Sequence, residues 1–140
     1  MRTGRCSLFR VGSLAYALPA MVGKSPVILL VEDESDLREV IEAALADEGC
    51  QVVSATDGDR ALALLSEGQR PALVLLDFIM PRMHGWAFLE RLRSDPTFHH
   101  VPVVSISALA ETHPAVTAVL RKPFELSSLI ETVRRFTCAP

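Results

Sequence analysis

Five polar side chains lie at or just past the ends of short, mostly apolar runs, and their types suggest chemistry on phosphate. They are Glu32, Asp33, Asp77, Ser107 and Lys122. Three carboxylates held close together raise one another's pKa values unless a cation lies among them, and Mg²⁺ suits such hard oxygen ligands. A lysine can neutralise a phosphoryl oxygen, and a serine hydroxyl can donate a hydrogen bond to another. If the fold brings them together, the set describes a phosphoryl-transfer site with a carboxylate nucleophile.

The elements that must position these side chains alternate along the chain. Short runs of mostly apolar residues predict strands over residues 27–31, 50–55, 72–76, 103–106 and 118–121. The continuous apolar runs among them are typical of strands that are covered on both faces. Segments of helical period separate most of them, and the first helix has Ser35 or Asp36 available as its cap. This alternation predicts an α/β fold with a doubly wound parallel sheet. Ligands bind beyond the carboxyl ends of such strands, where the five side chains lie.

The spacing leaves too little chain for a normal fourth helix. Between Ser107 and Lys122 lie 14 residues, and a strand over 118–121 leaves ten for two loops and a helix. A mean helix alone takes about 11 residues, and proline fits only the first turn, which restricts Pro114. We therefore predict that residues 109–115 form a loop or at most one helical turn, so that the fourth helix is shortened or missing.

Length and charge limit the class of protein. The 140 residues, 49% of them apolar, suit one globular domain. Residues 1–24 carry four basic and no acidic residues, and we predict that they are a disordered leader or an extension upstream of a start at Met21. Residues 25–138 are predicted to form the domain. Residues 25–140 carry ten basic and 17 acidic residues, a formal charge of −7, which argues against a nucleic-acid surface.

Cysteine use and hydropathy indicate the compartment. The three cysteines, Cys6, Cys50 and Cys138, form no metal-binding spacing, so we interpret them as reduced thiols of a cytoplasmic protein. No apolar run approaches the roughly 20 residues that a membrane-spanning helix needs. The sequence therefore predicts neither a membrane segment nor a structural zinc site.

Four motifs also carry a family resemblance. They are the segments 27–34 (VILLVEDE), 75–85 (LLDFIMPRMHG), 102–108 (PVVSISA) and 122–124 (KPF). In this order, each at a predicted strand end, they resemble the response-regulator receiver domain of two-component signalling, over about residues 25–138. The resemblance implies a flavodoxin-like, five-stranded parallel sheet in the strand order 2-1-3-4-5.

The resemblance also implies a role for each site residue. Asp77 would accept a phosphoryl group from a histidine kinase or histidine phosphotransfer protein. Asp33 would bind Mg²⁺ directly, Glu32 directly or through water, and Asp77 and the Ile79 backbone carbonyl would complete the protein ligands. Lys122 would pair with the phosphoryl group, with a cis bond to Pro123, and Ser107 would be the switch hydroxyl. The domain would then be a phosphoacceptor with at most slow self-dephosphorylation, not an enzyme.

Two features depart from the family. Receivers usually carry an aromatic switch residue three positions before the lysine, and here that position is Val119. The shortened fourth helix belongs to the same region, where phosphorylation is commonly read out. We therefore expect a phosphorylated single-domain regulator, of the chemotaxis or phosphorelay kind, that signals to an unknown downstream protein through an atypical output face. The pattern leaves homodimerisation open.

Other interpretations use the same residues differently. Taken singly, the acids, the lysine and the serine are also ordinary strand ends, helix caps or solvated charges. A receiver-like interaction module that works without phosphate is the main alternative, and the altered output region favours it. A magnesium-dependent phosphatase would need a second acid, typically two residues after the nucleophile, and the apolar Ile79 occupies that position.

Overall fold

The computed structural model describes residues 25–78, 85–108 and 113–137. The predicted leader and Ile79 lie outside these residues, as do positions 109–112. Within the described part of the chain, no helix is both long enough and apolar enough to cross a membrane.

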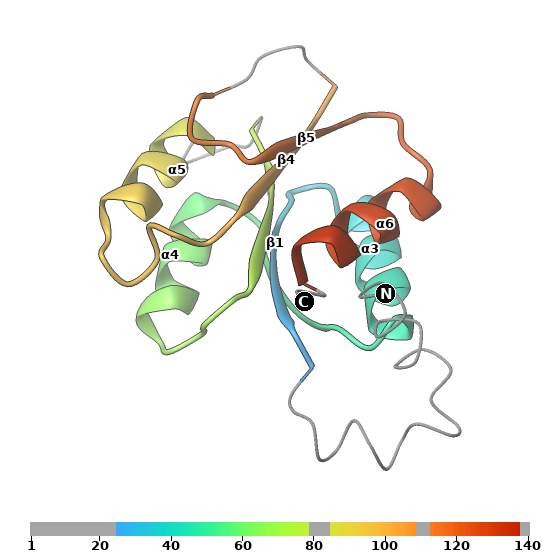
Figure 1. Cartoon of the computed structure of the whole chain (residues 1–140), viewed down its shortest axis with the longest axis horizontal. Helices are drawn as coiled ribbons and strands as arrows, with labels where there is room; N and C mark the ends of the chain where they lie inside the picture. Colours follow the sequence, from blue (N-terminus) through green and yellow to red (C-terminus); the bar gives the residue numbers. More distant parts are fainter. Residues whose placement is uncertain (1–24, 79–84, 109–112, 138–140) are drawn as a thin grey trace.

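The chain forms a five-stranded parallel sheet in the order β2-β1-β3-β4-β5, as predicted (Figure 1). Its strands are β1 (Val27–Val31), β2 (Gln51–Ala55), β3 (Leu73–Asp77), β4 (Val103–Ser107) and β5 (Ala118–Arg121). The central strands β1, β3 and β4 are almost entirely buried, which explains why their sequences are continuous apolar runs and not alternating ones.

Helices cover both faces of the sheet and create two cores. α4 (Gly58–Ser66) and α5 (Gly85–Ser94) pack on one face, and α3 (Ser35–Asp47) and α6 (Leu126–Thr137) on the other (Figure 1). Alternate residues of each strand serve alternate cores, so Leu29 and Val31 belong to the α4–α5 core and Ile28 and Leu30 to the α3–α6 core. This two-sided burial fixes the register of the strands.

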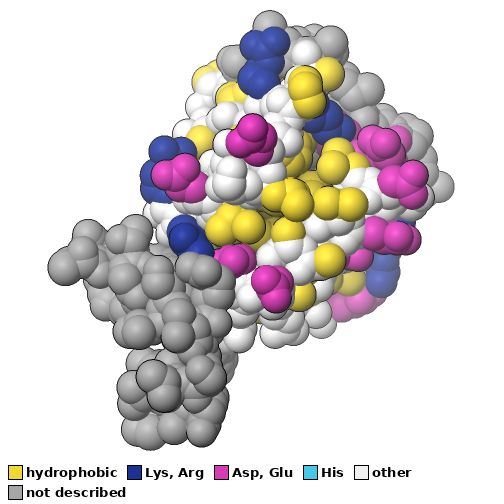
Figure 2. All heavy atoms as spheres, turned by 90° about the vertical axis from the view of Figure 1, so that its right-hand side faces the viewer, with side chains coloured by type: hydrophobic (Ala, Val, Ile, Leu, Met, Phe, Trp, Pro, Cys, Tyr) yellow, Lys and Arg dark blue, Asp and Glu magenta, His cyan; other side chains and the backbone are white. Residues whose placement is uncertain are grey.

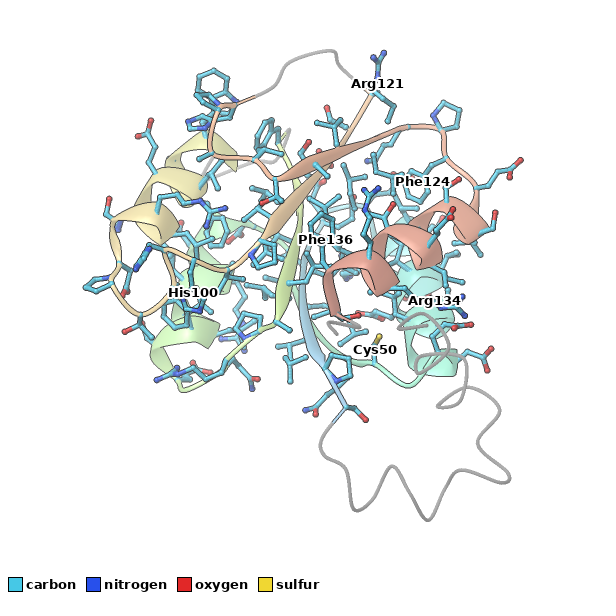
Figure 3. All side chains as sticks on the ribbon, viewed as in Figure 1. Cys50, His100, Arg121, Phe124, Arg134 and Phe136 are labelled. Atoms are coloured by element: carbon cyan, nitrogen blue, oxygen red, sulfur yellow. The ribbon has the colours of Figure 1, made fainter. Side chains whose placement is uncertain are left out.

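The α3–α6 face is closed by apolar contacts and one ion pair. Cys50, Phe124 and Phe136 pack against the core on this side (Figure 3). Arg134 of α6 donates to the carboxylate of Glu48, the C-cap residue of α3, at 2.6 Å. The two helices that cover this face of the sheet are therefore also tied directly to each other.

Helix starts follow local chemistry in one case and tertiary contacts in another. The Asp57 side chain accepts a hydrogen bond from the Arg60 amide at 2.9 Å and so caps α4. α3 begins one residue earlier than expected. Its cap is Glu34, without a side-chain cap bond, so the prediction of Ser35 or Asp36 as the cap is wrong. The Glu34 amide instead donates to the Glu32 carboxylate at 3.2 Å.

The described part of the β4–β5 connection, residues 113–117, contains no helix. Instead, the Arg93 guanidinium of α5 holds this segment by donating to the Ala115 carbonyl from Nε and Nη2, at 3.2 and 2.9 Å. Its Nη1 donates to the carbonyls of His99 and Val101 at 2.8 and 2.7 Å. For residues 113–115 the prediction of a loop or one turn is confirmed. The rest of the predicted segment, residues 109–112, lies outside the described residues.

Ser105 gives a prediction about stability. Its side chain is fully buried in β4, and its hydroxyl finds no hydrogen-bond partner among the described residues. Because an unpaired buried hydroxyl is destabilising, Ser105→Ala is expected to raise the free energy of unfolding by about 1 kcal/mol and Tm by a few degrees. Thermal unfolding followed by circular dichroism measures this change.

Ser54→Ala is the matched control, since the Ser54 hydroxyl donates to the Glu42 carboxylate. This variant is expected to gain nothing or to lose stability. A lower Tm for Ser105→Ala than for the wild type would contradict the prediction.

Candidate functional site

The five sequence-predicted side chains come together at one edge of the sheet. Strand register places Glu32 level with Asp77, because Val31 pairs with Leu76 in the neighbouring strand. Ser107 ends β4, and the Lys122 amide donates to the Ser107 carbonyl at 3.0 Å just past β5. Asp33 follows Glu32 at the end of β1. The parallel strands thus deliver all five residues to their carboxyl ends, as predicted.

Three carboxylates form the centre of the site. Glu32, Asp33 and Asp77 each offer a carboxylate oxygen, and these oxygens lie within 4.8 Å of one another. Glu32 is fully buried, Asp77 is 4% exposed, and Asp33 is exposed. The cluster therefore runs from the interior of the domain to its surface, with Asp33 on the solvent side.

Lys122 lies opposite the carboxylates. Its Nζ donates to Asp77 Oδ2 at 3.3 Å and lies 3.4 Å from Glu32 Oε1. Partial burial alone would lower the pKa of this ammonium, but the charges of Glu32 and Asp77 outweigh that effect and raise it. The bond between Lys122 and Pro123 is cis, which confirms the expectation from the family resemblance.

Glu32 carries the strongest electrostatic perturbation of the site. Burial, followed by repulsion from Asp77, raises the pKa of Glu32 to about 7. Its Oε2 accepts a bond from the Glu34 amide at 3.2 Å, whereas its buried Oε1 has no hydrogen-bond partner among the described residues. A buried acceptor of this kind is open to a cation.

The donor set fits Mg²⁺. Three converging carboxylates supply hard oxygen ligands, and the buried Oε1 of Glu32 accepts no hydrogen bond among the described residues and makes a 3.4 Å ion-pair contact with Lys122 Nζ. A divalent cation there would relieve the repulsion that raises the Glu32 pKa. Glu32, Asp33 and Asp77 would hold it, and the remaining expected ligand, the Ile79 carbonyl, lies outside the described residues.

Arg38 is a site residue that the sequence analysis missed. From the first turn of α3, its Nη1 donates to the backbone carbonyl of Glu32 at 3.0 Å, with a longer contact of 3.5 Å to that of Asp33. The guanidinium therefore holds the main chain that carries two of the acids. The sequence did contain a signal for this role, a basic residue in the first helical turn after Glu32 and Asp33.

Gly85 is a second missed residue. Its amide donates to the Phe78 carbonyl at 3.2 Å, and a Cβ built at Gly85 would lie 2.6 Å from the Phe78 Cα and 3.2 Å from the Asp77 carbonyl oxygen. Only glycine allows α5 to begin this close to the end of β3. The sequence analysis included Gly85 in a motif without assigning it a role.

Val119 occupies the position expected for an aromatic switch residue. Ala118 and Leu120 pack into the α3–α6 core, so alternation along β5 directs Val119 to the other face, where it is 41% exposed. A small, branched side chain there offers no ring that could turn inward.

Comparison with known proteins identifies the family. A family model described as the response regulator receiver domain matches residues 28–134. The chain belongs to this family. It is 32% identical over 118 residues to the probable transcriptional regulator ycf27 of Porphyridium aerugineum, a match that covers 77% of this chain and 48% of the relative. The chain thus spans about half the length of the curated relatives it matches.

Solved structures show the same receiver fold. The chemotaxis protein CheY4 of Vibrio cholerae has a TM-score of 0.72 and 28% identity, covering 80% of this chain and 98% of that one. The receiver domain of the sensor histidine kinase PA1611 from Pseudomonas aeruginosa also has a TM-score of 0.72 and 28% identity, with 80% and 97% covered. That structure holds a magnesium ion in its active-site cleft.

The raised pKa of Glu32 predicts a pH-dependent stability without divalent cations. The folded domain retains the Glu32 proton up to a pH of about 7, whereas the unfolded chain releases it near 4.5, so ionisation of Glu32 costs stability as pH rises between these values. Glu32→Gln removes this cost. Its advantage over the wild type in urea unfolding is expected to grow from about pH 4.5 to 7, by up to the order of 3 kcal/mol.

Glu39→Gln, at an exposed position on α3, controls for charge alone. The interpretation of Glu32 is wrong if the Glu32→Gln advantage is constant across this pH range.

Arg38→Met is expected to weaken Mg²⁺ binding roughly tenfold. The main chain at Glu32 and Asp33 would lose the hydrogen bonds that hold it, and the two carboxylates would be positioned less well. Isothermal titration calorimetry measures the affinity. Arg60→Met is the matched control, since the Arg60–Glu67 ion pair is exposed on α4. Equal Mg²⁺ affinity of the Arg38 variant and the wild type would contradict the role of Arg38.

Proposed function

We propose that this receiver domain accepts a phosphoryl group on Asp77 from a histidine kinase or histidine phosphotransfer protein, in a magnesium-dependent reaction. The observation that carries the proposal is the placement of the Asp77 carboxylate. It is almost buried, belongs to the three-acid cluster and accepts a hydrogen bond from Lys122 Nζ at 3.3 Å. A nucleophile, a cation site and a fixed positive charge thus share one edge of the sheet.

The transfer follows from these positions. A carboxylate oxygen of Asp77 attacks the phosphorus of a phosphohistidine. The P–N bond breaks with its electron pair passing to the imidazole, which takes up a proton from solvent. Lys122 neutralises charge on the phosphoryl oxygens, and Ser107 donates a hydrogen bond to one of them. Glu32, Asp33, Asp77 and, by the family resemblance, the Ile79 carbonyl would hold Mg²⁺, which would supply further charge neutralisation.

The acyl phosphate formed on Asp77 is expected to hydrolyse slowly. A phosphatase of this type needs an acid two residues after the nucleophile, and the side chain of Ile79 can neither donate a proton nor orient water. The domain therefore acts as a phosphoacceptor and not as a catalyst that turns over.

The face beside the site suits a protein donor. An apolar groove of about 400 Å³ runs next to Lys122, and it is lined by Leu37, Val40, Ala108, Lys122, Pro123, Phe124 and Leu126. Figure 2 shows hydrophobic side chains gathered in the middle of this α3–α6 face with acidic side chains around them. A helical phosphodonor with an apolar stripe and basic edges would fit this groove and bring its phosphohistidine to Asp77.

We also infer that this protein is a cytoplasmic regulator and that it signals through an unknown downstream protein. The formal charge of −7 on residues 25–140 supports docking onto proteins in preference to nucleic acid. Homodimerisation is open in this proposal, and a module that works without phosphate is the alternative, supported by Val119 and the β4–β5 connection.

Intact mass spectrometry after incubation with acetyl phosphate and Mg²⁺ tests the phosphoacceptor. The wild type is expected to gain one phosphoryl group, and Asp77→Ala none. Asp47→Ala is the matched control, because Asp47 is an exposed acid at the far end of α3.

An adduct that persists in Asp77→Ala would place the acceptor elsewhere. No adduct on the wild type, with acetyl phosphate or with histidine kinases as donors, would favour the phosphate-independent module.

A further inference from the structure

Three aromatic side chains form a continuous path from the end of β3 to the β4–β5 connection. The rings of Phe78 and Trp86 meet edge to face, with centroids 6.2 Å apart and planes at 64°. Trp86 meets the His113 imidazole in the same way, at 5.0 Å and 89°. Both distances fall within the range of favourable aromatic pairs.

The first end of this path is fixed to the phosphoacceptor. Phe78 is the residue after Asp77, and it is completely buried. The Gly85 amide donates to the Phe78 carbonyl, and the Gly85 backbone lies so close that a Cβ would be 2.6 Å from both Phe78 Cα and Cδ1. Trp86 is the next residue of α5. A displacement at the end of β3 therefore reaches Trp86 without a gap in the packing.

The other end is fixed to the β4–β5 connection. The His113 Nδ1 accepts a hydrogen bond from the Ala115 amide at 3.0 Å, and the His113 carbonyl accepts one from the Val116 amide at 2.9 Å. The Ala115 carbonyl in turn accepts two bonds from Arg93. Residues 113–117 are thus held against α5 at two points, by Trp86 near the start of the helix and by Arg93 near the end of the helix.

We propose that Trp86 is a positioning residue that couples Asp77 to the β4–β5 connection, in place of the missing ring at position 119. The inference rests on the proposed function only in naming phosphorylation as the event transmitted; the coupling itself requires no phosphate. The state of Asp77 changes the position of Phe78, and Trp86 passes that change to His113. Trp86 is 39% exposed, so the same residue also presents the change at the surface.

The coupling is tested by NMR of the His113 imidazole, without any phosphodonor. Asp77→Asn alters the charge of the site, and it is expected to shift the His113 ring resonances. In a Trp86→Leu background this Asp77→Asn shift should be lost. In Trp86→Phe, which keeps an aromatic edge, it should be retained. Trp86 is partly exposed, so both variants are expected to fold.

His100 is the internal control. It is exposed on the α5–β4 loop, and among the described aromatic pairs its ring meets the ring of His99 and not that of Phe78 or Trp86. Its resonances should not respond to Asp77→Asn in any background. A His113 shift that persists in Trp86→Leu, or none in the parent chain, would overturn the coupling. Absence of a mass adduct on Asp77 would instead reject the proposed function and leave this test unaffected.

Discussion

Three carboxylates held at one edge of a parallel sheet are an electrostatic constraint on everything around them. Glu32 is buried beside Asp77, and burial followed by repulsion from Asp77 raises its pKa, a cost that the fold has to accommodate. Lys122 offsets part of it from just past β5, and Arg38 holds the main chain of the acids from α3. Three converging carboxylates whose charge is only partly offset are the kind of ligand set that suits a hard divalent cation.

Much of this arrangement follows from the sequence. The apolar runs before Glu32, Asp77 and Lys122 had to be strands of one parallel sheet, and parallel strands end at a common edge. The chain length between Ser107 and Lys122 was enough to question a normal helix there. The order of the polar residues thus defined both the fold and the members of the site.

The rest depended on tertiary contacts that leave little trace in a single sequence. The start of α3 was misplaced because the Glu34 amide donates to the carboxylate of Glu32 and no side chain caps the helix, so the usual capping residues gave the wrong start. The sequence pattern assigned no role to Arg38, and Gly85 stood in a motif without a role of its own. Their roles come from distances to backbone atoms, and the periodicity of apolar residues carries no information about these distances.

Arg93 shows how the described part of the β4–β5 connection, residues 113–117, is held without a helix. Its guanidinium binds the carbonyls of His99, Val101 and Ala115, all of them main-chain groups. Every residue type offers the same carbonyl, so this anchoring does not depend on which side chains follow β4. The Arg93 contacts consequently fix the backbone at Ala115 whatever exposed side chains stand beside it. A substitution at the exposed Pro114 therefore leaves these main-chain acceptors in place, and the surface of the loop can vary there while its anchor is kept.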